Sequence, residues 1–394
     1  MIDRRILPLV LRDLEKKMVF VAGPRQCGKT ILAESVLSRV AGSYLNWDVD
    51  QHRRTIRASL MDERARLWVF DEIHKFPRWR NWLKGVFDLH RNRHTILVTG
   101  SARLDLYRRG GESLQGRYFL FRLHPFTLSE ILKTPVSSLD DLPLMEGTTA
   151  AGAEKTVQDL LVLGGFPEPF LSGSETEAKR WRLAYGSRLI RQDIHDLTQL
   201  KDLDRLELLY DRLPETVGSV LSINNLREDL EVGFQSVRNW VQVFEQMYSV
   251  FRVAPFGSSR IKAVKKERKL YLWDWSRLSD PGARVENLVA LHLLRLCHWA
   301  EDVHGEALDL RFFRSVVGHE IDFVLLRAGK PWMAIEVKVG ERPLSSGLNY
   351  FLQRVKTPFA FQLHLEGTTD TRTPDINGCR VRRMPVTNFL CNLP

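Results

Sequence analysis

Cysteine is scarce in this chain of 394 residues, which contains only Cys27, Cys297, Cys379 and Cys391. Their positions form neither a disulfide framework nor the close pairs that bind metals. Long apolar runs are also lacking, and no segment approaches the ~20 apolar residues that cross a bilayer. The chain begins Met-Ile-Asp-Arg-Arg, so charges interrupt it before the apolar core of a signal peptide can form. These absences exclude a disulfide-stapled domain and a membrane protein, and they predict a cytoplasmic location.

Acidic residues are fewer than basic ones. The 48 Asp and Glu residues against 58 Lys and Arg residues leave a net charge of +10. Such a balance favours anionic partners, either nucleic acid or an acidic protein, and it decides nothing about the fold. With 394 residues, of which 44% are hydrophobic, the chain is long enough to form two or three domains.

A glycine-rich loop follows an apolar run near the N-terminus. Residues 23–30 have the spacing Gly-x-x-x-x-Gly-Lys-Thr after the strand-like run Val19–Ala22, and a helix is expected over Ile31–Val40. This arrangement points backbone N–H groups and the positive end of a helix dipole at a phosphate. We expect Lys29 to reach the terminal phosphates of ATP and Thr30 to bind its Mg²⁺. The residues expected at the nucleotide are Gly23, Pro24, Arg25, Gln26, Cys27, Gly28, Lys29, Thr30 and Ile31.

Two further apolar runs end in polar residues that suit the same chemistry. Leu67–Phe70 reads as a buried strand and is followed by Asp71 and Glu72. Asp71 is expected to hold Mg²⁺, directly or through water, and Glu72 to polarise the attacking water. A strand that simply ends in solvated acids is the alternative. The next run ends at Thr99 and Ser101, where a hydroxyl can sense the γ-phosphate or merely belong to a turn.

The middle of the chain changes character twice. Residues Thr134–Ala153 are rich in Pro, Ser, Thr, Gly and Asp, which is typical of a linker. A mostly helical stretch follows. The expected domains are an ATPase core at 1–133, a linker and helical lid at 134–200, a winged-helix-like segment at 201–275 and a restriction-endonuclease-like domain at 276–394.

The winged-helix expectation comes from two helices and two strands in succession. The helices are expected over Ser222–Val232 and Gln235–Gln246, and the strands over Val250–Pro255 and Lys269–Trp273. The outer face of the second helix carries Ser236, Arg238, Asn239 and Gln242. The loop between the strands carries cations suited to phosphates, namely Arg260, Lys262, Lys265, Lys266, Arg268 and Lys269. Contact with DNA through this basic loop, 260–269, and contact with a protein both remain open.

A second group of charged residues occurs in the last third of the chain. A helix carries Glu286, and alternation along two predicted strands places Glu320 with Asp322, and Glu336 with Lys338. Asp322 and Glu336 can supply hard oxygen ligands to Mg²⁺, and Lys338 can position a metal-bound water. This is the arrangement of metal-dependent nucleases. The alternative is a solvated sheet face with alternating charges.

Together these segments resemble a family of prokaryotic ATP-binding proteins. The family pairs an AAA-type P-loop ATPase domain with a C-terminal domain of unknown function, of the 4143 type, that has a winged helix and a restriction-endonuclease-like (PD-(D/E)xK) core. The resemblance is carried by "GPRQCGKT", "LWVFDEIHK", "ILVTGSA", "SLQGRYFLFRLHPFTLSE", "GGFPE", "RVENLVALHLL", "HEIDFVL" and "AIEVKVG". It implies an α/β protein in which these domains follow one another.

The resemblance also implies roles for single residues. It sets Lys29 and Thr30 at the nucleotide, and Asp71 with Glu72 at the Mg²⁺ and the water. Ser101 stands at the sensor position, where related ATPases often have Asn. Arg117 resembles an arginine finger, which would act on a neighbouring subunit of a homo-oligomer.

Three functions are compatible with these features. The first is an ATPase that couples turnover to binding or processing of DNA. The second is a signalling or scaffold ATPase whose C-terminal domain is catalytically inert and binds protein. The third is a nuclease whose access to substrate is regulated by ATP.

Overall fold

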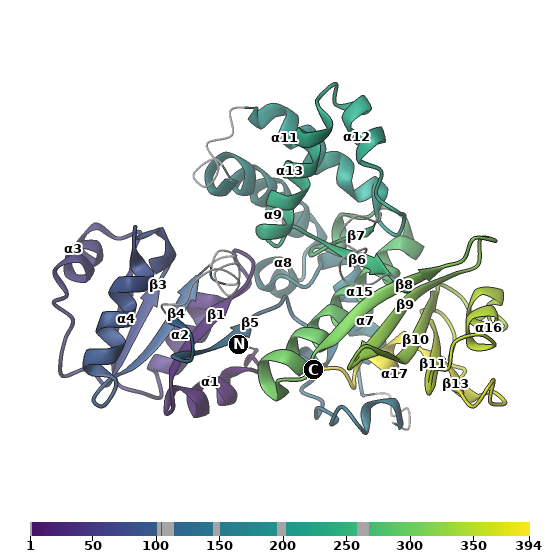
Figure 1. The fold of residues 1–394 in the computed structure, drawn as a ribbon, viewed down its shortest axis with the longest axis horizontal. Coiled ribbons are helices and arrows are strands. Elements are labelled where there is room, and N and C mark those ends of the chain that lie inside the picture. The colour runs from purple at the N-terminus through teal and green to yellow at the C-terminus, as the bar shows by residue number, and fades with distance from the viewer. Residues whose placement is uncertain (1, 101–103, 105–113, 145–149, 195–201, 258–267) are drawn as a thin grey trace. The chain divides into compact units, whose positions relative to one another are not determined.

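The structure is a computed structural model that describes residues 2–100, 104, 114–144, 150–194, 202–257 and 268–394. The chain divides into two compact units (Figure 1). The first comprises Met1–Pro125 with Gln246–Tyr248, and the second comprises Phe126–Glu245 with Ser249–Pro394.

The described strands of the first unit form one parallel sheet of five strands in the order β2-β3-β4-β1-β5. The strands are β1 (Met18–Ala22), β2 (Gly42–Asn46), β3 (Leu67–Asp71), β4 (Thr95–Gly100) and β5 (Tyr118–Arg122). The helices are α1 (Leu7–Leu14), α2 (Lys29–Leu37), α3 (Asp50–Ala58) and α4 (Trp79–His90). Because β1 and β3 are buried along their whole length, their apolar runs are those of strands covered on both faces.

This sheet brings the candidate site together. In a parallel sheet all strands end at the same edge, so the residues that follow β1 and β3 become neighbours although they are far apart in the sequence. Helix α2 begins at Lys29, two residues before the predicted start. Its first turn therefore lies directly after the glycine-rich loop.

The second unit begins with helices. They are α6 (Leu128–Leu132), α7 (Ala153–Leu163), α8 (Pro167–Ser172), α9 (Glu175–Arg188), α11 (Leu203–Arg212), α12 (Ile223–Asp229) and α13 (Phe234–Gln246). Ser222 caps α12 by accepting a hydrogen bond from the backbone N–H of Asn225. The buried face of α13 consists of Val237, Trp240, Val241 and Phe244, as predicted.

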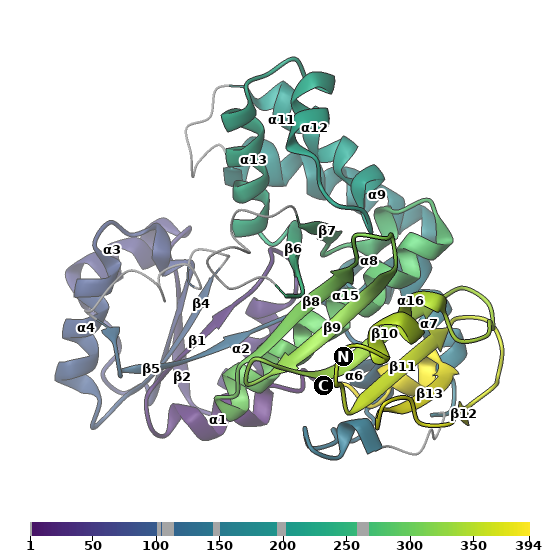
Figure 2. The same ribbon diagram turned by 45° about the vertical axis from the view of Figure 1, so that its right-hand side comes forward.

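A mixed sheet of eight described strands completes the second unit, in the order β12-β13-β11-β10-β9-β8-β6-β7 (Figure 2). The strands are β6 (Val250–Pro255), β7 (Lys269–Leu272), β8 (Leu308–Arg314), β9 (Glu320–Arg327), β10 (Lys330–Lys338), β11 (Phe359–His364), β12 (Thr371–Arg372) and β13 (Arg380–Pro385). The accompanying helices are α15 (Pro281–Trp299), α16 (Ser346–Leu352) and α17 (Val386–Leu390). Helix α15 packs across β7, β8 and β10. The mixed α/β fold with a parallel N-terminal sheet confirms the predicted fold class.

The two strands expected to form a free wing belong to this large sheet instead. Strands β6 and β7 pair in antiparallel fashion, but β6 also pairs with β8 in parallel through Ala254 and Arg311. Strands β6 and β7 therefore form one edge of the C-terminal sheet. This sheet contains strands from both sides of residue 275, where the winged-helix-like segment was expected to end. Of the predicted basic loop 260–269, residues 260–267 lie outside the described part of the chain, including Arg260, Lys262, Lys265 and Lys266.

Lys269 requires a correction. It was predicted to be one of the phosphate-binding cations of the wing, but its side chain is only 2% exposed. On β7, the side chain points toward the carboxylates described below rather than toward solvent. It cannot therefore contact a DNA backbone.

The segment expected to be a linker is tied to the rest of the second unit by polar contacts that include the following two. The hydroxyl of Thr134 donates to the backbone carbonyl of Cys391, and Asp140 forms an ion pair with Arg327. These contacts hold the described parts of the segment in place. Among the described residues, no helix is both long enough and apolar enough to cross a membrane.

A buried ion pair joins the start of the second unit to α15. Arg295 Nη2 lies 3.1 Å from Glu130 Oε1, with side chains 3% and 1% exposed, and Arg295 Nε donates to the backbone carbonyl of Pro394 at 2.8 Å. Removing one partner of such a pair leaves an uncompensated buried charge. We expect Arg295→Ala to lower the free energy of unfolding by ~3–5 kcal/mol, measured by urea denaturation.

The control is Lys179→Ala. Lys179 pairs with Glu175 at 2.7 Å, but both side chains are more than half exposed. Such surface pairs contribute at most about 1 kcal/mol. Equal losses in the two variants would contradict the assignment of a structural role to the buried pair.

Candidate functional site

Two glycines shape the loop between β1 and α2. Gly28 has φ 95°, a left-handed conformation that a side chain disfavours. A Cβ atom at Gly23 would lie 2.4 Å from the carbonyl oxygen of Leu123, so only glycine fits there. The loop is thus fixed in a tight turn whose backbone meets the N-terminus of α2.

Lys29 turns back onto this loop. Its side chain is buried, and Nζ donates to the carbonyl oxygens of Gly23 at 3.1 Å and Pro24 at 2.7 Å. Arg4 also stabilises the loop, because its Nη1 donates a hydrogen bond to the carbonyl of Cys27 at 2.7 Å. Burial raises the pKa of the Cys27 thiol, although Lys29 and Arg4 oppose the rise. Cys27 is therefore a protonated packing residue.

Asp71 lies at the centre of a hydrogen-bond network at the end of β3. It is 4% exposed. Thr99 donates to Oδ1 at 2.6 Å, and Tyr44, Asn46 and Thr30 donate to Oδ2, the last at 3.4 Å. All four donors are uncharged. Burial and the bond to Asp71 raise the pKa of Tyr44, so Tyr44 remains a phenol and a donor.

Tyr44 and Asn46 were not among the predicted site residues. They alternate on β2, so their side chains share one face, and β2 pairs with β3 so that Asn46 lies opposite Asp71. The available signal was the polar spacing Tyr-x-Asn at the end of a short strand. It indicates a site only once β2 is known to lie beside β3.

Glu72 follows in an uncommon backbone conformation. Its φ is 55°, the left-handed region that costs a non-glycine residue energy and often marks functional sites. The Glu72 carboxylate lies 3.6 Å from His74 Nε2 and 3.5 Å from Lys75 Nζ, and its side chain is 20% exposed. Solvent can therefore reach it, unlike Asp71.

These residues fit ATP and Mg²⁺. Thr30 and Asp71 offer hard oxygen atoms to a small divalent cation, while the charge of Lys29 and the backbone N–H groups of the first turn of α2 suit an anion. Thr30 and Ile31 are exposed at that turn. Thr99, the other hydroxyl weighed as a sensor, is hydrogen-bonded to Asp71, and Ser101 lies outside the described residues.

Arg117 lies where the strands of the same sheet begin, at the opposite end from the glycine-rich loop. It immediately precedes β5, and its carbonyl accepts a hydrogen bond from the N–H of Met18 at the start of β1. The five residues of β1 separate it from its own glycine-rich loop by ~16 Å at 3.3 Å per residue. Arg117 pairs with Asp88 at 2.9 Å beside a cleft of about 620 Å³. Its role in trans stays a prediction.

The predicted residues of the C-terminal unit do come together. Asp322 on β9 accepts a hydrogen bond from the N–H of Val337 at 2.8 Å, and Lys338 Nζ lies 2.6 Å from Glu336 Oε1. Glu286 on α15 accepts a hydrogen bond from the Tyr271 hydroxyl at 2.7 Å. Glu286, Glu320, Asp322, Glu336, Lys338, Lys269 and Tyr271 are called the carboxylate cluster below.

Lys269 is the member that sequence reasoning placed elsewhere. Its Nζ forms an ion pair with Glu320 and lies 3.6 Å from Glu286 and 4.0 Å from Asp322. Lys269 and Tyr271 are two apart on β7 and share a face. This spacing was a usable signal, but only if β7 was known to be part of the same sheet.

The cluster shifts the acidity of its members. Burial, and then the charge of Asp322, raises the pKa of Glu286 from 4.5 to about 8 and that of Glu336 to about 7. Burial lowers the pKa of Lys269, but the surrounding carboxylates, Glu286 first, raise it above its ordinary value overall. At neutral pH the lysine is therefore charged while the cluster retains part of its acidic protons.

The arrangement does not suit a metal. In the part of the chain that the structure describes, no group of three or more His, Cys, Asp or Glu residues is placed to hold a metal ion. The carboxylates surround Lys269 and Lys338 instead. The binding of Mg²⁺ by Asp322 and Glu336 stays a prediction that this geometry does not favour.

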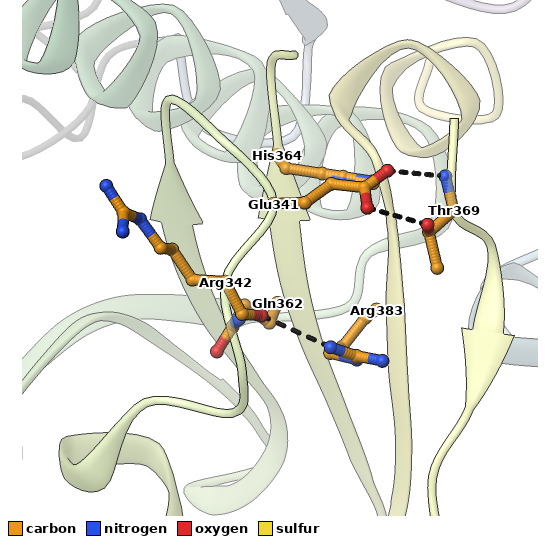
Figure 3. Close-up of a pocket in the computed structure, with 6 residues that line it drawn as sticks. All are labelled: Glu341, Arg342, Gln362, His364, Thr369 and Arg383. Atoms are coloured by element: carbon orange, nitrogen blue, oxygen red, sulfur yellow. Dashed lines mark hydrogen bonds and ion pairs between the residues drawn. The ribbon is translucent and has the colours of Figure 1, made fainter. Parts of the chain in front are cut away.

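A small hollow lies beyond the ends of β10 and β11 (Figure 3). Glu341 accepts hydrogen bonds from the N–H and hydroxyl of Thr369 at 2.8 and 2.7 Å, and the Arg342 side chain points away from the others (Figure 3). The hollow encloses about 10 Å³, which is about the room of one water molecule. It is too small for an organic ligand.

Family models match three consecutive parts of the chain. Residues 15–132 match an AAA domain. Residues 154–279 match a domain of unknown function (DUF8612), and residues 281–381 match a second one (DUF4143). The AAA match covers the whole glycine-rich loop and the Asp71 network, whereas the carboxylate cluster is divided between the other two matches.

The similar proteins have no assigned activity. An uncharacterized protein of Mycobacterium tuberculosis (Rv2008c) and one of Mycobacterium bovis (Mb2031c) are each 23% identical over 65% of this chain and 54% of their own length. This chain thus spans about half the length of these curated relatives. An uncharacterized protein of Methanocaldococcus jannaschii (MJ1637) is 22% identical over 87% of this chain and 79% of its own length.

A similarity to a solved structure is weak. The Orc1 protein of Aeropyrum pernix, solved in complex with DNA, aligns with a TM-score of 0.31 and 18% identity, over 72% of this chain and 91% of that chain. At this level of similarity, the DNA in that complex says nothing about the partners of this protein.

The acidity of the cluster leads to a prediction about pH. Glu286 and Glu336 hold protons up to about pH 8 and 7 in the folded protein, but only to about pH 4.5 in the unfolded chain. The folded state therefore binds more protons between these values, and stability falls as pH rises through this window. We expect Glu286→Gln to flatten the decline, by at most about 1.4 kcal/mol per pH unit for one group.

Urea unfolding at several pH values across this window measures the effect. Glu341→Gln is the control, because the bonds from Thr369 lower the pKa of Glu341 and it titrates below the window. A decline as steep in Glu286→Gln as in the wild type would disprove the role assigned to Glu286.

Proposed function

We propose that this protein binds ATP with Mg²⁺ and hydrolyses it at the loop between β1 and α2. The observation that carries the proposal is the position of the Thr30 hydroxyl, 3.4 Å from Asp71, directly after a loop that fits a phosphate. A hydroxyl on α2 and a carboxylate on β3 thus face one another where the terminal phosphates would lie. The match of residues 15–132 to an AAA domain supports the same conclusion.

Lys29, Asp71 and the residues around them have separate roles in binding the nucleotide. Lys29 leaves the carbonyls of Gly23 and Pro24 and pairs with the phosphates, which are stronger acceptors because they are charged. The uncharged donors around Asp71 hold its carboxylate toward Thr30. A bound Mg²⁺ would neutralise phosphate charge and polarise the bond to be broken.

Glu72 is suited to the proton transfer. It is partly exposed and lies just beyond Asp71, so a water can occupy the space between its carboxylate and the terminal phosphate. As the water oxygen bonds to phosphorus, Glu72 accepts its proton, and the bond to the bridging oxygen of ADP breaks.

Two substitutions separate binding from turnover. Lys29→Ala should weaken ATP binding severely, because it removes the charge that faces the phosphates. Glu72→Gln should leave binding largely intact and slow turnover by ~10²–10⁴-fold, the range of a lost general base. Filter binding of labelled ATP and phosphate release measure the two effects.

Matched controls lie outside the loop. Lys16→Ala and Glu63→Gln remove the same groups from other positions of the same unit, and both should behave as the wild type. If Lys29→Ala and Glu72→Gln both retained wild-type turnover, the ATP site would have been wrongly assigned.

We further propose that ATP turnover is coupled to DNA. The support is the net charge of +10 and the outward face of α13, where Arg238, Asn239 and Gln242 are exposed. The second candidate is a scaffold whose C-terminal unit binds protein. It is favoured by one observation, namely that lysines already neutralise part of the carboxylate cluster.

DNA-stimulated ATP turnover distinguishes these two candidates. Single- or double-stranded DNA should accelerate turnover at low salt, with the effect fading as salt rises. Arg238→Glu should reduce the stimulation, and Arg180→Glu on α9, an equally charged change on another exposed helix face, should not. Turnover that ignores DNA at every salt concentration would favour the protein-binding scaffold.

A further inference from the structure

Lys269 is held in the carboxylate cluster by its own backbone. Strand β7 pairs with β6 through Val253 and Lys269, and Lys269 also forms an isolated bridge with Val220. The N–H of Leu221 donates to the carbonyl of Arg268 at 2.9 Å. Because the chain is fixed on both sides of β7, the side chain of Lys269 cannot leave the cluster by a movement of a free loop end.

The ammonium group lies where several acidic groups meet. Its contacts are Glu320 and Asp322 from β9 and Glu286 from α15, so one cation joins three carboxylates from two elements. The aromatic ring of Phe312 lies 5.6 Å from Nζ on another side. With 2% of its side chain exposed, Lys269 is shielded from water and must be neutralised by these acids.

Basic side chains compensate much of the charge of the cluster. Glu286, Glu320, Asp322 and Glu336 carry up to four negative charges, Lys269 and Lys338 supply two positive ones, and Arg314 adds a third where it lies 3.7 Å from Glu320. A divalent ion bound at 2.0–2.6 Å from these oxygens would lie close to the Lys269 ammonium and be repelled by it.

One carboxylate oxygen of the cluster is available to accept a further bond. Glu336 Oε2 is buried and has no hydrogen-bond partner among the residues that the structure describes, although Oε1 of the same carboxylate pairs with Lys338. Carboxylate oxygens that could bind a cation are thus present. Oxygen atoms of Glu286, Glu320 and Asp322 lie within 4.0 Å of Lys269 Nζ, so the lysine occupies the point between the acids that a cation would need.

We propose that Lys269 is a built-in cation that takes the place of a divalent metal, so that the carboxylate cluster excludes metal in the native protein and becomes a metal site when Lys269 is replaced by a neutral residue. The cluster then joins β7, β9 and α15 by ion pairs and does not support metal-dependent cleavage of nucleic acid. This inference does not depend on the ATP site, which lies in the first unit.

Calorimetric titration of the full chain with Mn²⁺ in the absence of nucleotide tests the proposal. Wild type should show no binding assigned to the cluster at millimolar Mn²⁺. Lys269→Met, which keeps an unbranched side chain of nearly the same length and removes its charge, should gain at least tenfold in affinity and a rise in melting temperature with Mn²⁺. The double variant Lys269→Met with Asp322→Asn should lose that gain.

Lys338→Met is the matched control. It removes the other lysine but leaves Lys269 among the three carboxylates, so it should gain no comparable Mn²⁺ binding. Any binding at the ATP site is common to all of these variants and cancels in the comparison.

Three results would overturn the proposal. The first is Mn²⁺ binding by the wild type that Asp322→Asn alone abolishes. The second is a folded Lys269→Met protein that binds no more metal than the wild type. The third applies if Lys269→Met does not fold: Lys269→Gln then replaces it, and failure of Mn²⁺ both to bind this variant and to restore folding of Lys269→Met contradicts the proposal.

Discussion

The placing of buried carboxylates is the constraint on which both units depend. A carboxylate removed from water must be compensated by hydrogen bonds, by a cation or by a proton. Asp71 in the first unit is surrounded by the uncharged donors Thr30, Tyr44 and Thr99. The cluster of the second unit is compensated mainly by the charged groups of Lys269 and Lys338. These two kinds of compensation differ in how well the carboxylates can still bind a metal ion.

Uncharged donors orient Asp71 without cancelling its charge. The carboxylate therefore still attracts a cation, and the loop beside it presents an anion-binding surface, so the combination suits a metal nucleotide. In the cluster, Lys269 cancels charge at the point where the acids meet. The acids there are the ones that the sequence suggested for a metal-dependent nuclease, and Lys269 lies among them. Residue types at the right spacing are thus insufficient evidence for an activity.

The site residues whose arrangement depends on their neighbours in the chain could be predicted from the sequence. The glycine-rich loop, the start of α2 and the acids after β3 are set by neighbouring residues, so their spacing predicts their arrangement. Tyr44, Asn46 and Lys269 depend on which strands pair. The pairing of β2 with β3 and of β6 with β8 is decided by burial of apolar faces across the whole sheet, which a motif does not encode. Lys269 was therefore assigned to a solvent-facing wing because the loop before it is basic.

The position of β7 has a consequence for how the second unit acts. Strand β7 begins with Lys269, which three acids of β9 and α15 hold in place, so β7, β9 and α15 are joined by ion pairs. Breaking these ion pairs would leave several carboxylates buried without a partner, which is far more costly than losing a surface ion pair. Within the second unit, these ion pairs fix the start of β7 against β9 and α15. The cluster therefore has a structural role, whereas the residues proposed to hydrolyse ATP lie in the first unit.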